Sequence, residues 1–206
     1  MDEEDYEKWQ IQFLNECYRI LKPNGSLFYN HKIRRFEGEA LFPKWIFDTD
    51  FKMYQMIIWD RGGNQDPNKS YLFPNTELIF WLVKDKPKVF KDNAIYKNEV
   101  WRINPSRLKI HPATFPEEIP LNCILLTTSE NDTILDPFMG SGTTGIVSKK
   151  TNRNFIGIEI DETYFNLSKQ KIEITTNSLN DNSAERVEDY FRININENYK
   201  RNDFIS

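Results

Sequence analysis

The hydrophobic residues near the start of the chain fall on one face of a helix. Between Tyr6 and Lys22 the apolar positions recur every three or four residues, which is the period of an amphipathic helix. Pro23 cannot continue the helical hydrogen bonds and Gly25 permits a left-handed turn, so the helix is expected to end there. Later apolar runs, bounded by turn residues, are typical of strands. Together these patterns predict a helix over 6–22, a strand over 26–30, a second helix, a strand over 53–59, a loop and a strand over 76–83.

The second half of the chain alternates short apolar runs with helical periods. Its pattern predicts a helix over 116–129, a strand over 132–136, a helix over 142–150, a strand over 154–159 and a helix over 164–176. A strand–helix–strand–helix unit pairs its strands in parallel, and helices cover both faces of such a sheet. The sequence is therefore assigned to the α/β class, with a mostly parallel sheet and helices on both faces.

Two segments do not fit this alternation. Residues 84–110 show no clean period and alternate basic residues with aromatic ones, so we interpret them as an irregular insert. From residue 177 the chain is rich in Asn and charge, which predicts a polar C-terminal tail over 177–206. The 206 residues are enough for one α/β domain with a hydrophobic core, and this domain is predicted to span 1–176.

The charge is unevenly distributed along the chain. A net charge of −4 argues against a protein that coats nucleic acid through bulk electrostatics. Residues 84–109 are the exception, because basic side chains outnumber acidic ones there. The basic ones are Lys84, Lys86, Lys88, Lys91, Lys97, Arg102, Arg107 and Lys109, and the acidic ones are Asp85, Asp92 and Glu99. Together with Tyr96 and Trp101 they could contact phosphates and stack on a displaced base, although a solvated loop could have the same composition.

The sequence contains no sign of a membrane segment, a secretion signal or a metal site. No apolar run is long enough to cross a membrane, and the acidic residues 2–5 do not resemble a signal peptide, so a cytoplasmic location is expected. Neither Cys17 nor Cys123 lies near another Cys or a His at metal-ligand spacing. Both are predicted to be buried thiols, and no metal ligand is assigned.

The residues from Asp136 to Thr144 join a predicted strand to a predicted helix. Gly140 and Gly142 stand at alternate positions there, where the backbone must turn tightly and can approach a ligand closely. An ordinary glycine-containing turn would also explain them. The pattern Gly-Ser-Gly-Thr lacks the third glycine of the dinucleotide fingerprint in register, which disfavours NAD as the ligand.

Two carboxylates lie at the ends of the neighbouring predicted strands. Glu159 closes the second strand, where a carboxylate can accept hydrogen bonds from both hydroxyls of a ribose, although a solvated acid would fit there too. Asp136 ends the first strand and faces the crevice in which open α/β sheets bind ligands, but it could instead cap the following helix. The motif therefore favours a small ligand that carries a ribose.

These elements resemble the S-adenosylmethionine (SAM)-dependent DNA methyltransferases that modify the exocyclic amino group of adenine (N6) or cytosine (N4). The segment 136–144, Asp-Pro-Phe-Met-Gly-Ser-Gly-Thr-Thr, resembles their SAM-binding motif, and 155–161 with Tyr164 resembles the ribose-binding strand that follows. The segment 111–116, His-Pro-Ala-Thr-Phe-Pro, is similar to an element that contacts the methionine end of the cofactor. Further similarity lies at Trp9, Leu14, Arg19, 21–26, Ile58, Trp59, 74–77, Val83 and Lys84.

The resemblance implies a Rossmann-like methyltransferase fold with SAM as the cofactor. Carried over residue by residue, the cofactor would be bound by His111, Pro112, Thr114, Asp136, Phe138, Gly140, Ser141, Gly142, Thr143 and Glu159. The target-binding half precedes the SAM-binding half, which is the permuted order called the β class. In that order the insert, here residues 84–110, recognises double-stranded DNA. Its candidate contacts are Lys88, Lys91, Tyr96, Trp101, Arg102 and Arg107.

The family's catalytic Asp-Pro-Pro-Tyr motif, or a similar Asn/Ser-Pro-Pro-aromatic motif, is missing. None of the ten prolines is adjacent to another, so no catalytic residue is assigned. In the family the strand that leads into this motif is central, between the SAM strand and the strand predicted here at 26–30. The sheet is therefore expected to be incomplete. We hypothesise a truncated product, or one half of a split enzyme whose upstream partner polypeptide supplies the strand.

The expected reaction is methyl transfer from SAM to the amino group of adenine or of cytosine in DNA. Adenine is favoured because it is the commoner target in the family. A restriction-modification system, with a cognate restriction endonuclease as partner, is the expected setting. A non-catalytic SAM- or DNA-binding module is an alternative that the missing motif supports. Methylation of RNA or of a small molecule is a third reading, which the basic and aromatic insert disfavours.

Overall fold

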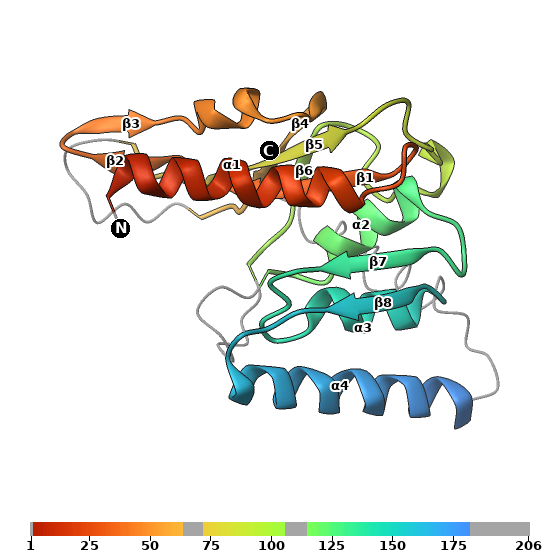
Figure 1. Ribbon diagram of the computed structural model, residues 1–206. Coiled ribbons are helices and arrows are strands. Elements are labelled where there is room, and N and C mark those ends of the chain that lie inside the picture. The colour runs from red at the N-terminus through yellow and green to blue at the C-terminus, as the bar shows by residue number, and fades with distance from the viewer. Residues whose placement is uncertain (1, 64–71, 106–114, 182–206) are drawn as a thin grey trace. The chain divides into compact units, whose positions relative to one another are not determined.

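The computed structural model describes residues 2–63, 72–105 and 115–181, and for 177–181 the backbone alone. The chain divides into two compact units (Figure 1). The first unit comprises Met1–Pro105 with Leu125–Thr128, and the second comprises Ser106–Ile124 with Ser129–Ser206. The single domain predicted over 1–176 stays a prediction.

The helices and strands of the first unit follow the predicted order with one exception. Its elements are α1 (Glu3–Ile20), β1 (Ser26–His31), β2 (Arg34–Phe36), β3 (Glu39–Leu41), η1 (Lys44–Asp48), β4 (Lys52–Asp60), β5 (Thr76–Val83), η2 (Lys91–Asn93) and β6 (Val100–Arg102). The predicted first helix and the three predicted strands are confirmed. The helix begins earlier than predicted because Asp2 caps it, its side chain accepting a hydrogen bond from the Asp5 backbone at 2.8 Å.

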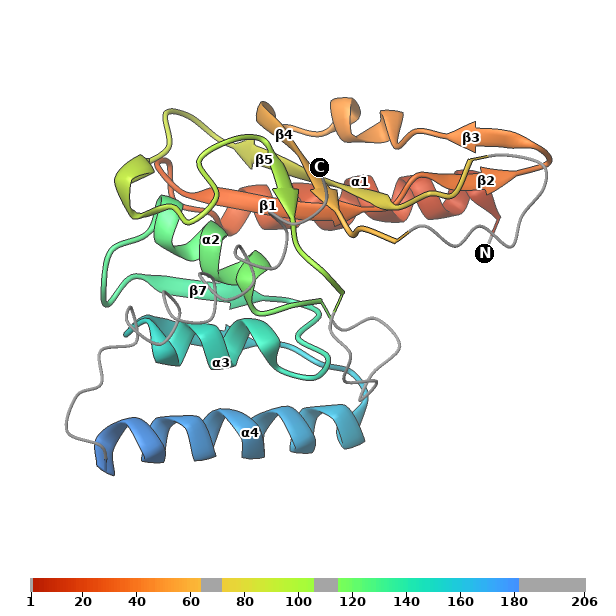
Figure 2. The same cartoon turned by 180° about the vertical axis from the view of Figure 1, so that it is seen from behind.

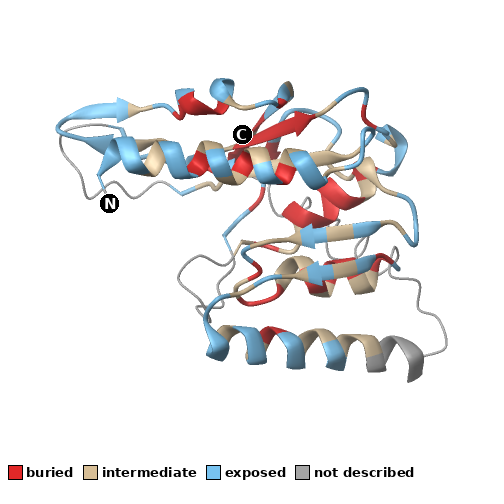
Figure 3. Cartoon of the chain, viewed as in Figure 1, coloured by how far each residue is buried: buried red, intermediate tan, exposed pale blue. Residues whose placement is uncertain are grey.

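The exception is the second helix, which was predicted between the first two long strands and is wrong. The chain forms the β2–β3 hairpin there, followed by the short 3₁₀ helix η1. Glu37 (φ 49°) and Gly38 (φ 86°) make the two-residue turn, since this turn type needs a positive φ at both positions. Most residues of both short strands are exposed (Figure 3). Strands of three residues carry no measurable period, so hydrophobic periodicity could not reveal them.

Four strands of the first unit form one mixed sheet in the order β1-β5-β4-β6. β5 pairs antiparallel with both β1 and β4, and only β6 runs parallel to its neighbour β4. The prediction of a mostly parallel sheet is therefore wrong for this unit, although the α/β class is confirmed. The described residues between β4 and β5, 61–63 and 72–75, contain no helix, and strands joined without a crossover helix run antiparallel.

The central strand β5 is buried on both faces. Phe80 and Leu82 pack with Leu14 and Cys17 of α1 in one hydrophobic cluster, and the side chains alternate along the strand. Trp81 therefore lies on the opposite face, where it is 2% exposed. Buried side chains therefore lie on both faces of the sheet at β5.

The insert predicted as irregular contains two short regular elements. η2 is a single 3₁₀ turn, and β6 extends the sheet because Trp59 of β4 pairs with Trp101. Trp59 also donates its indole hydrogen to the backbone oxygen of Ile103 at 2.8 Å. The insert is thus fixed to the C-terminal end of β4.

The second unit has the predicted strand–helix–strand–helix order (Figure 1; Figure 2 gives the view from behind). Its elements are β7 (Thr133–Asp136), α3 (Thr143–Lys150), β8 (Asn154–Gly157) and α4 (Glu162–Asp181), and α2 (Glu118–Thr127) has residues in both units. β7 and β8 pair in parallel, as predicted, and α3 contacts both strands and α4. The helix α4 continues to Asp181, so the first residues of the predicted polar tail are helical.

Several strands have an edge with no partner among the described residues, and β1 and β7 are the two that bear on the expected central strand. β1 is the last strand on one side of its sheet, and β7 pairs with β8 alone. Backbone N–H and C=O groups at a strand edge are obligatory hydrogen-bonding groups that another strand or water must satisfy. The central strand that the resemblance implies is not among the described strands.

Candidate functional site

The loop between β7 and α3 holds two glycines with left-handed backbone conformations. Gly140 has φ 48° and Gly142 has φ 84°, values that residues with a Cβ atom rarely adopt. The backbone N–H of Met139 in the same loop donates to the oxygen of Ile158 at 3.0 Å. The loop is therefore held beside the residue that follows β8.

Asp136 ends β7 and closes this loop from one side. One carboxylate oxygen accepts the backbone N–H of Phe138 at 3.1 Å, and the other accepts the hydroxyl of Thr144 at 2.6 Å. Thr144 lies in the first turn of α3, so Asp136 does help to cap that helix. Each carboxylate oxygen can accept a further hydrogen bond, and the predicted ligand contact of Asp136 stays a prediction.

Glu159 follows β8 and joins the loop from the other side. Its Oε2 accepts the backbone N–H of Gly140 at 2.9 Å, and its Oε1 accepts the backbone N–H of Asp161 at 2.9 Å. The carboxylate therefore fixes the Gly140 turn instead of extending freely into solvent. Its remaining lone pairs are available to a ligand that offers two hydroxyl donors.

Tight packing leaves no room for larger residues under the loop. A Cβ atom at Gly142 would lie 2.8 Å from the Cβ of Ser168 on α4. One at Gly157 of β8 would lie 2.3 Å from the sulfur of Met139. A Cβ atom at Gly140, by contrast, would meet nothing closer than the Phe138 oxygen at 3.9 Å. Gly142 and Gly157 are thus closely packed, whereas the space next to Gly140 is open.

The second unit brings seven of the predicted cofactor residues together on this loop and the end of β8. Phe138 is 59% exposed and Ser141 is buried, with its hydroxyl 3.5 Å from that of Thr143. The other four are Asp136, Gly140, Gly142 and Glu159. The predicted residues His111, Pro112 and Thr114 lie outside the described residues.

Sequence reasoning missed the residues that support this loop. Thr144 holds Asp136, and the hydroxyl of Ser168 lies 2.9 Å from the Phe165 oxygen, to which it donates, and 3.5 Å from the Met139 sulfur. A Thr in the first helical turn after a strand-end Asp was a usable signal for the first contact. No local sequence pattern indicates that Ser168 contacts Met139, because the two residues are 29 positions apart in the chain.

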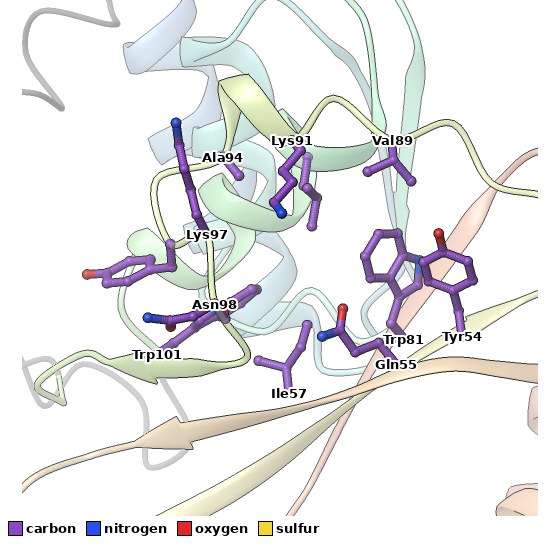
Figure 4. A pocket seen from close by; sticks show the side chains of 12 residues that line it. Tyr54, Gln55, Ile57, Trp81, Val89, Lys91, Ala94, Lys97, Asn98 and Trp101 are labelled. Atoms are coloured by element: carbon purple, nitrogen blue, oxygen red, sulfur yellow. The ribbon is translucent and has the colours of Figure 1, made fainter.

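The first unit places three of the predicted DNA contacts, Lys91, Tyr96 and Trp101, at one pocket of about 230 Å³ (Figure 4). Lys91 and Tyr96 line it from the insert, and Tyr54 and Gln55 line it from β4. Lys88 and Arg102 are exposed, and Arg102 lies 3.7 Å from the carboxylate of Asp60. Arg107 lies outside the described residues.

Trp101 does not lie on the surface as a stacking contact requires. It is 1% exposed, and its indole donates a hydrogen bond to the backbone oxygen of Asn98 at 3.0 Å. Its ring forms part of the pocket wall beside Tyr96, with the ring centroids 6.1 Å apart. The assignment of Trp101 as a base-stacking residue is therefore wrong, because its rings are already covered by the core.

A second polar cluster surrounds His31 at the C-terminal end of β1. The Tyr6 hydroxyl lies 3.1 Å from Nε2 of His31, and the His31 ring stacks on Tyr29 and meets Trp45 edge-on. Burial, and then the positive charge of Arg34, lower the pKa of His31 from its usual value. The imidazole is therefore neutral at pH 7 and serves as a hydrogen-bonding and packing group.

The described residues contain neither a cluster of metal ligands nor a membrane-spanning helix. No group of three or more His, Cys, Asp and Glu side chains in 2–63, 72–105 and 115–181 could hold a metal ion. Over the same ranges no helix is both long and apolar enough to cross a membrane.

Comparison with known proteins gives the same family along most of the chain. The model of the N6_N4_Mtase family, described as DNA methylase, matches residues 1–170. The type II methyltransferase M.BglII of Bacillus subtilis is 31% identical over 205 residues, which cover 81% of this chain and 57% of the relative. M2.LlaDCHI of Lactococcus lactis subsp. cremoris is 33% identical, covering 74% of this chain and 62% of the relative. The chain thus spans about three fifths of the length of these relatives.

Solved structures agree with the fold. The PvuII DNA methyltransferase, described as cytosine-N4-specific, superimposes with a TM-score of 0.73 at 22% identity and covers 84% of this chain and 76% of its own. The M1.HpyAVI–SAM complex superimposes with a TM-score of 0.65 at 28% identity and covers 82% of this chain and 84% of its own. Both share the Rossmann-like methyltransferase architecture that the resemblance implied.

Proposed function

Because this chain belongs to the N6_N4_Mtase family of DNA methylases, we propose that it provides the SAM-binding part of a DNA amino-methyltransferase. When bound, SAM supplies a methyl group on a sulfonium, which the exocyclic amino nitrogen of adenine (N6) or cytosine (N4) takes by in-line displacement while the amine loses a proton. We propose adenine, rather than cytosine, as the target base.

The hydrogen bond from Gly140 to Glu159 carries the proposal. It places a carboxylate beside an open, left-handed glycine turn at the carboxyl ends of two parallel strands. This is the position at which open α/β sheets bind nucleotide-like ligands. The carboxylate suits a ribose, because two hydroxyl groups can donate to its two oxygens.

The residues present are chemically suited to SAM. Glu159 would accept the ribose hydroxyls, and Asp136 would meet the amino group or the sulfonium of the cofactor. The open space over Gly140 allows the ligand to approach the backbone closely. Phe138, 59% exposed, offers an apolar surface at the same loop. We assign Ser141, Gly142, Thr143 and the residues His111, Pro112 and Thr114 to the same cofactor site.

The contribution of this chain to the reaction is positioning. Direct transfer requires the amine nitrogen to lie in line with the bond between sulfur and methyl, and holding two reactants in such a geometry supplies much of the rate enhancement. The carboxylates of Asp136 and Glu159 accept three hydrogen bonds from the loop and the start of α3, and Glu159 accepts a fourth from Asp161 after β8. No proton acceptor is assigned among the residues of this chain.

The DNA contacts are proposed for the insert of the first unit. Lys88, Lys91, Arg102 and Arg107 would meet phosphates, and Tyr96 would pack against a nucleotide. The excess of basic over acidic residues in 84–109 supports this placement in an otherwise acidic protein. Double-stranded DNA is therefore the proposed macromolecular substrate.

The catalytic Pro-Pro motif is proposed to come from a segment outside these 206 residues, in the same polypeptide or in a partner. The unpaired edges of β1 and β7 among the described strands favour this arrangement, because a strand supplied with the motif could pair there. Without that segment the chain would act as a SAM- and DNA-binding module, which is the second candidate function.

The biological setting is proposed from the relatives. M.BglII and M2.LlaDCHI are named type II methyltransferases, so we place this chain in a restriction-modification system with a cognate endonuclease. Its substrate would then be the DNA of the cytoplasm.

The proposal is tested with methyl-labelled SAM and unmethylated duplex DNA. The purified chain is assayed alone and with an added polypeptide that carries the Pro-Pro motif, taken from the N-terminal part of a related enzyme. We expect label on DNA with the added polypeptide and none with a Glu159→Ala variant. Mass spectrometry of the nucleosides then distinguishes N6-methyladenine from N4-methylcytosine. Transfer that persists in the variant, or label on RNA in place of DNA, would contradict the proposal.

A further inference from the structure

A β-bulge in β4 turns two consecutive side chains toward the same pocket. The register with β5 shifts between Met53 and Gln55, so that Met53 pairs with Leu82 and Gln55 with Trp81. In a regular strand Tyr54 and Gln55 would point to opposite faces, yet both line the pocket of the first unit. Bulges of this kind re-aim side chains and are frequent next to functional sites.

The side wall of the pocket is aromatic and fixed. Tyr54 and Trp81 lie with ring centroids 4.6 Å apart, and the Trp81 indole is held by a 2.9 Å hydrogen bond to the hydroxyl of Ser26. Trp81 is buried, whereas Tyr54 is 51% exposed. The rigid indole thus supports a second ring with accessible surface, on which a planar ligand can stack.

Polar and cationic side chains also line the pocket, namely Gln55, Lys91, Lys97 and Asn98. The amide of Gln55 and the amino group of Lys91 both point into it from opposite sides (Figure 4). Gln55 donates a single long hydrogen bond, 3.5 Å, to the carboxylate of Glu99, which leaves its amide oxygen for a donor on a ligand. Lys91 brings a positive charge from η2.

The size and chemistry of the pocket select the ligand class. About 230 Å³ is below the roughly 300–1,000 Å³ of pockets for drug-sized molecules, so a single planar group fits better than a larger compound. An amide that both donates and accepts matches the edge of a nucleobase, an aromatic ring matches its face, and an ammonium group matches the adjoining phosphate.

We propose that this pocket binds one unpaired nucleotide of a DNA strand, with its base on Tyr54, the edge of the base on Gln55 and its phosphate on Lys91. The inference rests on the proposed function and deepens it, because it assigns DNA recognition to two residues of β4 in addition to the insert. Tyr54 and Gln55 thereby become candidates for base preference, while Lys91 contributes affinity for any sequence.

The test uses the full chain and fluorescein-labelled single-stranded oligonucleotides, with binding followed by anisotropy. Tyr54→Leu is expected to weaken binding roughly 5- to 100-fold, the range for removing one base stack. Lys91→Met is expected to weaken binding at least about 5-fold, because a phosphate loses its cation. Lys86→Met removes the same charge from the same basic segment, away from the pocket, and should change binding less than 3-fold. Gln55→Leu should change the ranking of oligonucleotides that differ in base composition.

An oligonucleotide with an abasic position separates base from phosphate recognition. The effect of Tyr54→Leu should disappear when the base is absent, whereas the effect of Lys91→Met should remain. Competition with inorganic phosphate equal to that of the oligonucleotide would overturn the inference in favour of a simple anion site. Equal losses for Lys86→Met and Lys91→Met would overturn it in favour of diffuse electrostatics.

SAM binding, measured on the same preparations, distinguishes this inference from the proposed function. Tyr54→Leu and Gln55→Leu that bind SAM like the wild type, but bind the oligonucleotides unchanged, would refute the pocket and leave the cofactor site standing. A wild-type chain that binds no SAM would refute the proposed function. Circular dichroism melting confirms that each variant is folded.

Discussion

The carboxylate of Glu159 lies 2.9 Å from the backbone nitrogen of Gly140, although 19 residues separate them in the chain. This hydrogen bond ties the glycine turn after β7 to the residues after β8. The same carboxylate also holds the backbone N–H of Asp161, just before α4 begins. One side chain therefore sets the relative positions of both loops at this end of the strand pair.

Replacing Glu159 should loosen the Gly140 turn. A hydrogen bond to a charged acceptor contributes about 1.5–3 kcal/mol, so amide exchange at Gly140 in Glu159→Ala should rise roughly 10- to 100-fold. Hydrogen–deuterium exchange followed by NMR measures this rate. Glu162→Ala, which removes an exposed acid from the first turn of α4, serves as the control. Unchanged protection of Gly140 would mean that the carboxylate does not support the turn.

A methyl group at Gly145 should destabilise the second unit. A Cβ atom there would lie 2.4 Å from the Ile172 side chain and 2.6 Å from the Phe155 ring, so either these side chains or α3 must move. Overpacking of this kind costs about 1–3 kcal/mol, and Gly145→Ala should melt at a lower temperature despite its better helix propensity. Lys149→Ala, on the same helix, should change stability by less than about 0.5 kcal/mol. A rise in melting temperature for Gly145→Ala would disprove the close packing.

The stability of the first unit should fall on mild acidification through His31. Burial and the charge of Arg34 depress its pKa in the folded state, so below about pH 6.5 the unfolded chain binds a proton that the folded chain does not. Stability is then lost as the pH falls, by at most about 1.4 kcal/mol per pH unit. Urea unfolding at pH 7.5 and 5.5 measures the change, and His31→Phe should reduce it. An equal change in both proteins would assign the effect to other groups.

The thiol of Cys17 should be unreactive in the folded protein. Burial raises its pKa to about 11, so about one thiol in a thousand is ionised at pH 8, and burial raises the pKa of Cys123 as well. Titration with a thiol-specific chromogenic reagent should show little reaction before unfolding and two equivalents in denaturant. Fast labelling of Cys17 in the native protein would contradict its burial on the face of α1 that packs against β5.

Long periodic elements were predictable from the sequence because their burial is regular. The stripe of α1 and the strand at Thr76–Val83 were identified within a few residues, and the glycine loop was found because Gly140 and Gly142 need positive φ values. The hairpin at Arg34–Leu41 was missed because each strand has three residues. Its turn of Glu37 and Gly38 was the signal that could have revealed it.

Tertiary contacts explain the remaining differences. Trp101 was interpreted as a stacking residue because basic residues surround it in the sequence, yet its pairing with Trp59 in the sheet buries it. The bulge that brings Tyr54 and Gln55 to one pocket depends on the register with β5, which no local pattern contains. The support of Met139 by Ser168 likewise depends on the packing of α4 against the loop.

Calorimetric titration of the purified chain with SAM tests the central claim most directly. We predict one binding site, and an affinity that falls at least about 10-fold in Glu159→Ala, because the ribose hydroxyls lose a charged acceptor. Glu162→Ala should bind like the wild type. A folded chain that shows no SAM binding, or one whose binding is the same in Glu159→Ala, would contradict the assignment of this loop as the cofactor site.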